Sequence, residues 1–140
     1  MTMKALIDTN VLLDTLLQRE PFCKGSDRIF DLVSEGKIEG CISVQSLIDV
    51  YYFCKKVHKD NNKFDVIEKL SFVFEVIEIS GQDSISAIMS DTDDYEDGLL
   101  LFSALRNNVE AIITRNERDF NESSIVLINP KDIDRFLNES

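Results

Sequence analysis

The sequence lacks the features of a membrane, exported or zinc-binding protein. No stretch approaches the roughly 20 consecutive apolar residues that a membrane helix needs, and Asp8 interrupts the first apolar run too early for a signal peptide. The cysteines at positions 23, 41 and 54 are widely spaced and form no C-x-x-C pair, which argues for reduced thiols rather than disulfides or a zinc site. We therefore expect a cytoplasmic protein without a membrane partner.

Histidine and basic residues are also scarce. His58 is the single histidine and is far from every motif described below, so histidine acid–base cleavage of RNA is not supported. The chain has 15 Lys and Arg against 26 Asp and Glu, a net charge of −11, whereas a generic nucleic-acid binder carries a basic face. The acidity must be spread over solvated faces, concentrated in a metal site, or complementary to a basic partner.

Short apolar runs alternate with helical patterns along the chain. Strands are expected at residues 4–7, 39–42, 76–79, 111–114 and 126–128. Helices are expected at residues 11–17, 21–33, 43–54, 64–74, 84–89, 95–105 and 130–136, with a polar bend at 55–63. This alternation predicts a parallel sheet covered by helices on both faces. A length of 140 residues without a repeat or linker favours a single domain over 1–140.

Polar residues gather where ligands bind in such a fold, beyond the carboxyl ends of the strands. They follow the first and fourth expected strands, or open the helix before the fourth: Asp8, Asp94, Asp97, Thr114, Arg115, Asn116 and Asp119. Carboxylates in one cleft repel one another unless a cation neutralises them. Oxygen donors without a convergent His or Cys suit Mg²⁺ or Mn²⁺. Asp94 and Asp97 could also cap their helix, whereas Asp8 ends a buried strand and needs a partner.

Four segments in this order make the sequence resemble a PIN domain: residues 7–13, 43–52, 94–99 and 113–120. The resemblance runs from about residue 4 to 136 and fits the branch that includes VapC-type toxins of bacterial toxin–antitoxin pairs. It implies a three-layer α/β/α fold with a central, mostly parallel sheet of about five strands. It also implies a Mg²⁺- or Mn²⁺-dependent endoribonuclease, whose metal lowers the pKa of a bound water for in-line attack on RNA.

The resemblance assigns roles to three acidic positions and one amide. Asp8 and Asp97 would be the central metal ligands, and Asn10 would orient Asp8. Asp49 stands where the family normally has a glutamate. Because Asp is one methylene shorter, its contact with the metal could pass through water. Asp94 would lie beside the ligands, as a cap or as a contact of the site.

The fourth acidic position falls within residues 114–119. Many relatives carry Asp directly after Thr-Arg, but this chain has Asn116 there. Either Asp119 substitutes, which completes a catalytic set with the three aspartates above, or the fourth carboxylate is absent. Thr114 would position the scissile phosphate, and Arg115 would hold a flanking one.

Two other classes of α/β protein share parts of this pattern but lack residues that their chemistry needs. A HAD-type phosphatase needs a second Asp where Asn10 stands, and a response-regulator receiver needs an Asp after the third strand, where Ser80 and Gly81 stand. A PIN-fold module that binds RNA or a protein without cutting remains the alternative, because Asp49 and Asn116 depart from the family pattern. The resemblance further implies a homodimer and an antitoxin that presents Arg or Lys to the cleft. The lysines of residues 55–63 could guide RNA or merely be solvated.

Overall fold

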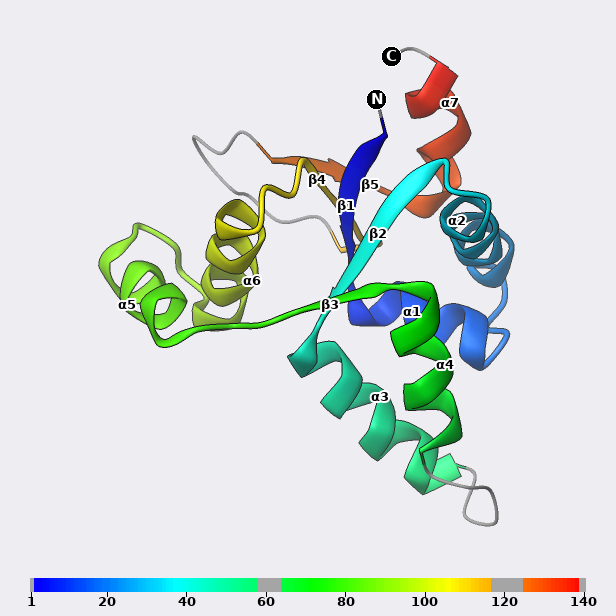
Figure 1. The fold of residues 1–140 in the computed structure, drawn as a ribbon, viewed down its shortest axis with the longest axis horizontal. Coiled ribbons are helices and arrows are strands. Elements are labelled where there is room, and N and C mark those ends of the chain that lie inside the picture. The colour runs from blue at the N-terminus through cyan, green and yellow to red at the C-terminus, as the bar shows by residue number, and fades with distance from the viewer. Residues whose placement is uncertain (1, 58–63, 117–124, 139–140) are drawn as a thin grey trace.

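The computed structural model describes residues 2–57, 64–116 and 125–138. Within these ranges, five parallel strands form one sheet with the order β3-β2-β1-β4-β5 (Figure 1). The strands are β1 (Met3–Ile7), β2 (Ile38–Ser43), β3 (Glu75–Ile77), β4 (Ala111–Ile113) and β5 (Val126–Ile128). The α/β class and the five-stranded parallel sheet expected from the sequence are confirmed.

Helices cover both faces of the sheet, as Figure 1 shows. Their bounds are α1 (Thr9–Leu16), α2 (Cys23–Ser34), α3 (Val44–Val57), α4 (Asp65–Val73), α5 (Gly81–Met89), α6 (Tyr95–Arg106) and α7 (Ile133–Asn138), with a 3-10 turn at Pro130–Asp132. Helices α1 to α4 and α7 lie on one side. Helix α6 lies on the other, with α5 packed outside it. No helix among the described residues is both long and apolar enough to span a membrane.

Strand β1 occupies the middle of the sheet because its side chains are apolar on both faces. Ala5 and Ile7 belong to the core beneath α1, α2 and α3, and Leu6 belongs to the core beneath α6. All three side chains are fully buried. A strand that is buried on both faces has a continuous run of apolar residues in its sequence, which explains why β1 was predicted well.

Several helices differ in length from the sequence-based expectation. Helix α1 starts earlier, at Thr9, because the Asp8 side chain caps it. Helix α3 continues through Val57, so the bend expected from residue 55 was wrong for the last turn of α3. Helix α5 begins at Gly81, because Ser80 and Asp83 form a capping box.

Gly98 allows α5 to lie close against α6. A Cβ atom at this position would stand 2.8 Å from the Cβ of Ala87 and 3.1 Å from the Cγ2 of Thr92. A side chain would therefore push α5 away from the first turns of α6. Since Asp97 is the preceding residue, this close packing also fixes the position of the helix turn that carries it.

The topology creates the place for a site. From β1 the chain moves outward through β2 to β3, and then returns through α5 and α6 to β4 on the opposite side of β1. Because the strand order reverses beside β1, the segments that follow β1 and β4 run in opposite directions from the carboxyl ends of these strands. In open α/β sheets, ligands bind at such a reversal of strand order. Residues that follow β1, β2 and β4 consequently meet there.

Candidate active site

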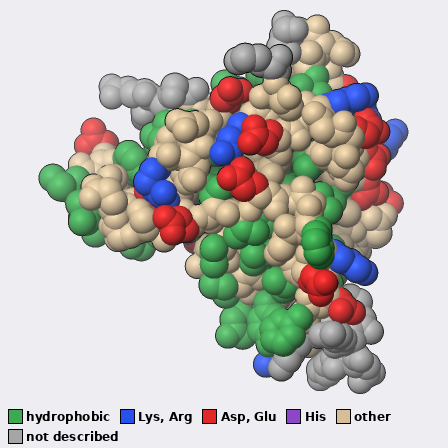
Figure 2. Space-filling model, in the orientation of Figure 1, with side chains coloured by type: hydrophobic (Ala, Val, Ile, Leu, Met, Phe, Trp, Pro, Cys, Tyr) green, Lys and Arg blue, Asp and Glu red, His purple; other side chains and the backbone are tan. Residues whose placement is uncertain are grey.

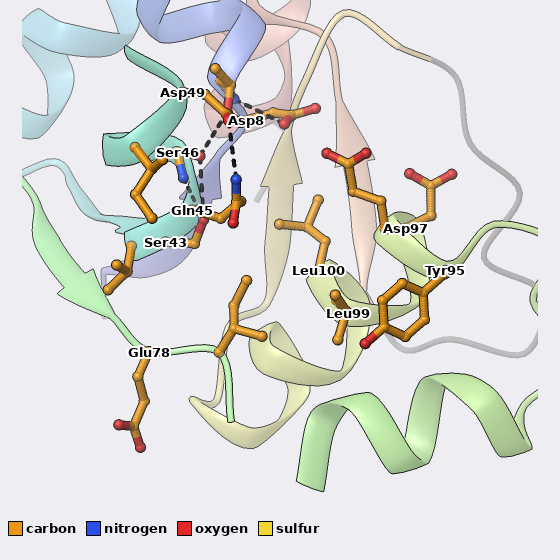
Figure 3. Close-up of a pocket in the computed structure, with 15 residues that line it drawn as sticks. Asp8, Ser43, Gln45, Ser46, Asp49, Glu78, Tyr95, Asp97, Leu99 and Leu100 are labelled. Atoms are coloured by element: carbon orange, nitrogen blue, oxygen red, sulfur yellow. Dashed lines mark hydrogen bonds between the residues drawn. The ribbon is translucent and has the colours of Figure 1, made fainter. Parts of the chain in front are cut away.

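A pocket of about 770 Å³ lies at the carboxyl ends of β1 and β2, between the first turns of α3 and α6. Asp8, Asp49 and Asp97 all line it, so the structure brings together three of the four predicted catalytic residues. In Figure 3, Asp49 and Asp97 lie on opposite sides of Asp8. Glu78 and Glu96 add two further carboxylates to the lining, and no Lys or Arg is among its described residues.

Asp8 is held at the junction of β1 and α1. Its backbone N–H donates to the carbonyl of Ile113 at 3.0 Å, which extends the pairing of β1 with β4. One carboxylate oxygen, Oδ1, accepts from the N–H of Thr9 at 2.9 Å as the cap of α1. The other, Oδ2, accepts from the Thr114 hydroxyl at 2.8 Å and from the Asn10 amide at 3.3 Å. With only 8% of the residue exposed, Asp8 has a single well-defined orientation.

The residues predicted to surround Asp8 form a connected network. The amide of Asn10 also donates to Thr114 Oγ1 at 3.2 Å, and its Oδ1 accepts from the Arg115 N–H at 3.3 Å. Thr114 Oγ1 accepts in addition from the Asn116 N–H at 3.0 Å. The segment after β4 is therefore tied to the start of α1, and Thr114 is only 3% exposed.

Asp94 and Asp97 occupy different places at the start of α6. Asp94 is the N-cap, and its Oδ1 accepts from the Asp97 N–H at 2.9 Å. Asp94 is exposed and is not among the residues that line the pocket. Asp97 is half-buried and faces the pocket from the first turn of the helix. The sequence allowed each of these aspartates to be either a helix cap or a residue of the site. In the structure, Asp94 is the cap and Asp97 lines the pocket.

Asp49 projects from the second turn of α3 and accepts a hydrogen bond from the Gln45 amide at 3.1 Å. Two contacts place this helix. Ser43 caps it by accepting from the Ser46 N–H at 3.1 Å, and the hydroxyls of Ser46 and Thr9 share a hydrogen bond of 2.8 Å. Sequence reasoning identified the cap but not the contact between Ser46 and Thr9, which joins α3 to the residue after Asp8.

The oxygen atoms that line this pocket are of the chemical type that binds a hard divalent cation. The charged donors are carboxylate oxygens, and no His or Cys is among the described residues of the lining, which favours Mg²⁺ or Mn²⁺ over zinc. Within the part of the chain that the structure describes, no group of three His, Cys, Asp or Glu side chains is close enough to hold a metal by itself.

Arg115 has a different environment from the one its position in the sequence suggested. Its guanidinium binds the carboxylate of Asp14 through Nε and, at 3.1 Å, through an Nη atom. The guanidinium carbon also lies 3.9 Å from the centre of the Phe22 ring. The side chain thus packs against α1 and the segment before α2, and a contact with a flanking phosphate stays a prediction.

Sequence reasoning missed Asp14. This residue is fully buried in α1 and also binds Arg19, whose Nε lies 2.8 Å from Asp14 Oδ1. A signal was present, because an aspartate interrupts the apolar residues 11–17. Asp119 and His58 lie outside the described residues, so the choice between Asp119 and Asn116 as the fourth acidic position stays open.

Comparison with known proteins agrees with this arrangement. The family model of the PIN domain matches residues 4–118. The chain belongs to the PIN domain family. The expectation based on the four sequence segments is thereby confirmed.

Solved structures of toxin–antitoxin proteins are similar to this PIN domain. One is a toxin–antitoxin complex from Klebsiella pneumoniae, with a TM-score of 0.67 and 25% identity over 90% of this chain and 97% of that one. Two others are DNA-bound VapBC from Salmonella typhimurium (TM-score 0.66, 20% identity, 92% and 99% covered) and FitAcB from Neisseria gonorrhoeae (TM-score 0.67, 16% identity, 91% and 98% covered). At such identities, these two show the fold alone. No curated protein sequence matches the chain.

Proposed function

We propose that this PIN domain is a Mg²⁺- or Mn²⁺-dependent endoribonuclease and the toxin of a toxin–antitoxin pair. The observation that carries the proposal is the pocket in which a buried, oriented Asp8 lies between Asp49 and Asp97. The similarity to toxin–antitoxin structures supports the second half of the proposal.

The protein's own residues would hold the cation and the substrate in place. Asp8 and Asp97 would bind the ion, and Asp49 would contact it directly or through water. When bound, the ion lowers the pKa of a coordinated water and polarises the phosphoryl oxygen. Thr114 and Asn10 keep the Asp8 carboxylate in one orientation through the hydrogen bonds at its Oδ2. Asp119 is proposed as the fourth carboxylate on sequence grounds.

The shape of the pocket favours a substrate with an unpaired base. Its volume of about 770 Å³ exceeds what a hydrated ion and a phosphate fill, and part of its wall is apolar, with Ile48, Leu99 and Tyr95. Tyr95 is 53% exposed, and its hydroxyl shares a hydrogen bond of 2.6 Å with Ser84. An exposed aromatic ring that is held in place is suited to stacking on a base of single-stranded RNA.

Cleavage of a labelled single-stranded RNA tests the proposal. We expect internal cuts with Mg²⁺ or Mn²⁺, none with EDTA, and none with the Asp8→Asn variant. Thermal unfolding of both proteins without metal serves as the control for folding. Cleavage that is equal with and without EDTA, or that survives Asp8→Asn in a purified preparation, would contradict the assignment.

The second candidate is a PIN module that binds RNA or a protein without cutting. The observations that favour it are Asn116, at a position where many relatives carry Asp, and the lack of three grouped ligands among the described residues. The same assay separates the two functions. A module of this kind would retard RNA on a native gel but leave it intact with either metal.

We further propose that the chain forms a homodimer and binds a basic antitoxin. Figure 2 shows hydrophobic side chains gathered over α3, where Val44, Ile48, Tyr52 and Val57 are each more than 40% exposed. An uncovered apolar face of this kind is typical of an interface. Sedimentation at micromolar concentration would give a dimer. An antitoxin that presents Arg or Lys to the acidic pocket would bind more weakly at high salt and to Asp97→Asn.

A further inference from the structure

The fully buried carboxylate of Asp14 is the strongest feature of the described structure that the proposed chemistry leaves unused. Its side chain has no exposure, while its two partners, Arg19 and Arg115, are 36% and 24% exposed. Buried ion pairs contribute little net stability, because desolvation opposes their attraction.

Both arginines that Asp14 binds also donate to the same residue, Asn10. An Nη atom of Arg19 donates to the Asn10 carbonyl at 3.2 Å. The backbone N–H of Arg115 donates to Asn10 Oδ1 at 3.3 Å. Asn10 in turn donates from Nδ2 to Asp8 Oδ2 and to Thr114 Oγ1. The carboxylates of Asp14 and Asp8 are therefore linked through two intervening residues, an arginine and Asn10.

The route through Arg115 also sets which way the Asn10 amide is turned. Oδ1 of Asn10 accepts from the Arg115 N–H, so Nδ2 must be the atom that faces Asp8. If the amide turned over, its oxygen would face the oxygen of the Asp8 carboxylate, and the two would repel each other. Anchoring the guanidinium of Arg115 on Asp14 and Phe22 holds this backbone N–H in place.

We propose that Asp14 is a positioning residue of the active site, which acts through Arg19 and Arg115 to fix Asn10 and thereby the carboxylate of Asp8. The proposal rests on the proposed nuclease function for its catalytic consequence, but not for its structural half. Asp14, Arg19 and Asn10 lie behind the pocket and are not among the residues that line it.

The test compares Asp14→Asn with a matched control, Asp83→Asn. Asp83 is likewise a buried aspartate, 2% exposed, that binds an arginine, Arg106, through two nitrogens. This second pair joins α5 to α6 and makes no contact with Asn10. Both substitutions remove one charge from a buried pair, so both should lower the melting temperature. Arg115→Gln is the second variant, in case Asp14→Asn does not fold.

The first measurement is the ¹H–¹⁵N signal of the Asn10 side-chain amide without metal, assigned by its loss in Asn10→Ser. We expect this signal to shift or broaden in Asp14→Asn and in Arg115→Gln, and to match the wild type in Asp83→Asn. An unchanged signal in the first two variants, or an equal change in all three, would overturn the proposal. This measurement needs no nuclease activity.

The second measurement is steady-state cleavage of RNA. If Asp14 positions the site, kcat should fall about tenfold in Asp14→Asn, as for loss of an outer-shell partner, while KM stays within about threefold. Asp83→Asn should keep both constants. The double variant Asp14→Asn with Asn10→Ser should lose no more kcat than the more affected of the two single variants. If the two losses in kcat were fully additive, the proposed effect of Asp14 on catalysis would be overturned. A wild type that does not cleave would overturn the proposed function, and the amide signal would still decide the role of Asp14.

Discussion

The hydroxyl of Thr114 is the single buried group on which the orientation of Asp8 depends most. It donates to Asp8 Oδ2 at 2.8 Å and accepts from Asn10 Nδ2 at 3.2 Å and from the Asn116 N–H at 3.0 Å. Thr114→Val keeps the shape of the side chain and removes all three hydrogen bonds. Thr114→Ser keeps the hydroxyl and removes only a methyl group.

The expected cost of Thr114→Val follows from these contacts. A hydrogen bond to a charged group contributes about 1.5–3 kcal/mol, and each buried partner left unsatisfied adds about 1 kcal/mol or more. Asn116 is exposed, so its N–H can bind water instead. Only Asp8 Oδ2 and Asn10 Nδ2 then lose a buried hydrogen-bond partner. We expect the free energy of unfolding to fall by about 2–4 kcal/mol and Mn²⁺ affinity to fall about 10- to 100-fold.

Urea unfolding without metal and a Mn²⁺ titration by calorimetry measure these two effects. Thr114→Ser should lie within about 1.5 kcal/mol of the wild type, since only one methyl group is lost, and should bind Mn²⁺ normally. If the Val and Ser variants were equal in both measurements, the hydroxyl would not be what orients Asp8, and the reasoning would be refuted.

Three further predictions concern the other carboxylates. Asp94→Ala should cost about 1 kcal/mol of stability as a lost helix cap with cleavage retained, whereas Asp97→Asn should abolish cleavage and leave the melting temperature nearly unchanged. Asp49→Glu should retain or improve cleavage with Mg²⁺, and Asp49→Ala should weaken it; equal activity in both would make Asp49 an ordinary surface residue. Burial alone raises the pKa of the Asp83 carboxyl, but hydrogen bonds, led by those from Arg106, outweigh burial and hold the pKa below its usual value. The stability that this pair contributes is therefore fully present above about pH 4 and is lost as the pH falls through the lowered pKa, so melting curves of wild type and Asp83→Asn should converge in acid.

Much of the fold could be predicted from the sequence because its strands are short and mostly apolar, and the central strand β1 has buried side chains on both faces. The run at residues 4–7 forms β1 almost as expected, and Asp8 follows it at the carboxyl end of the central strand. The placement of Asp8 and Asp97 at one pocket follows from the same rule, since both belong to segments that meet where the strand order reverses.

The contacts that orient the site could not be read in this way. Asp14 and Arg115 are separated by 101 positions, and Thr9 and Ser46 by 37, so no local pattern reports either pair. An aspartate inside an apolar helix indicates a buried partner but not which one. The identity of that partner depends on how β4 lies beside β1, which only the tertiary structure determines.

A crystal soaked in Mn²⁺ and measured at the manganese absorption edge tests the central claim most directly. We expect an anomalous peak in the pocket within coordination distance of the carboxylates of Asp8 and Asp97, with water completing the shell. The same soak of Asp8→Asn should lose the peak. A peak elsewhere on the chain, or RNA cleavage that requires Mn²⁺ while the pocket stays empty, would contradict the account.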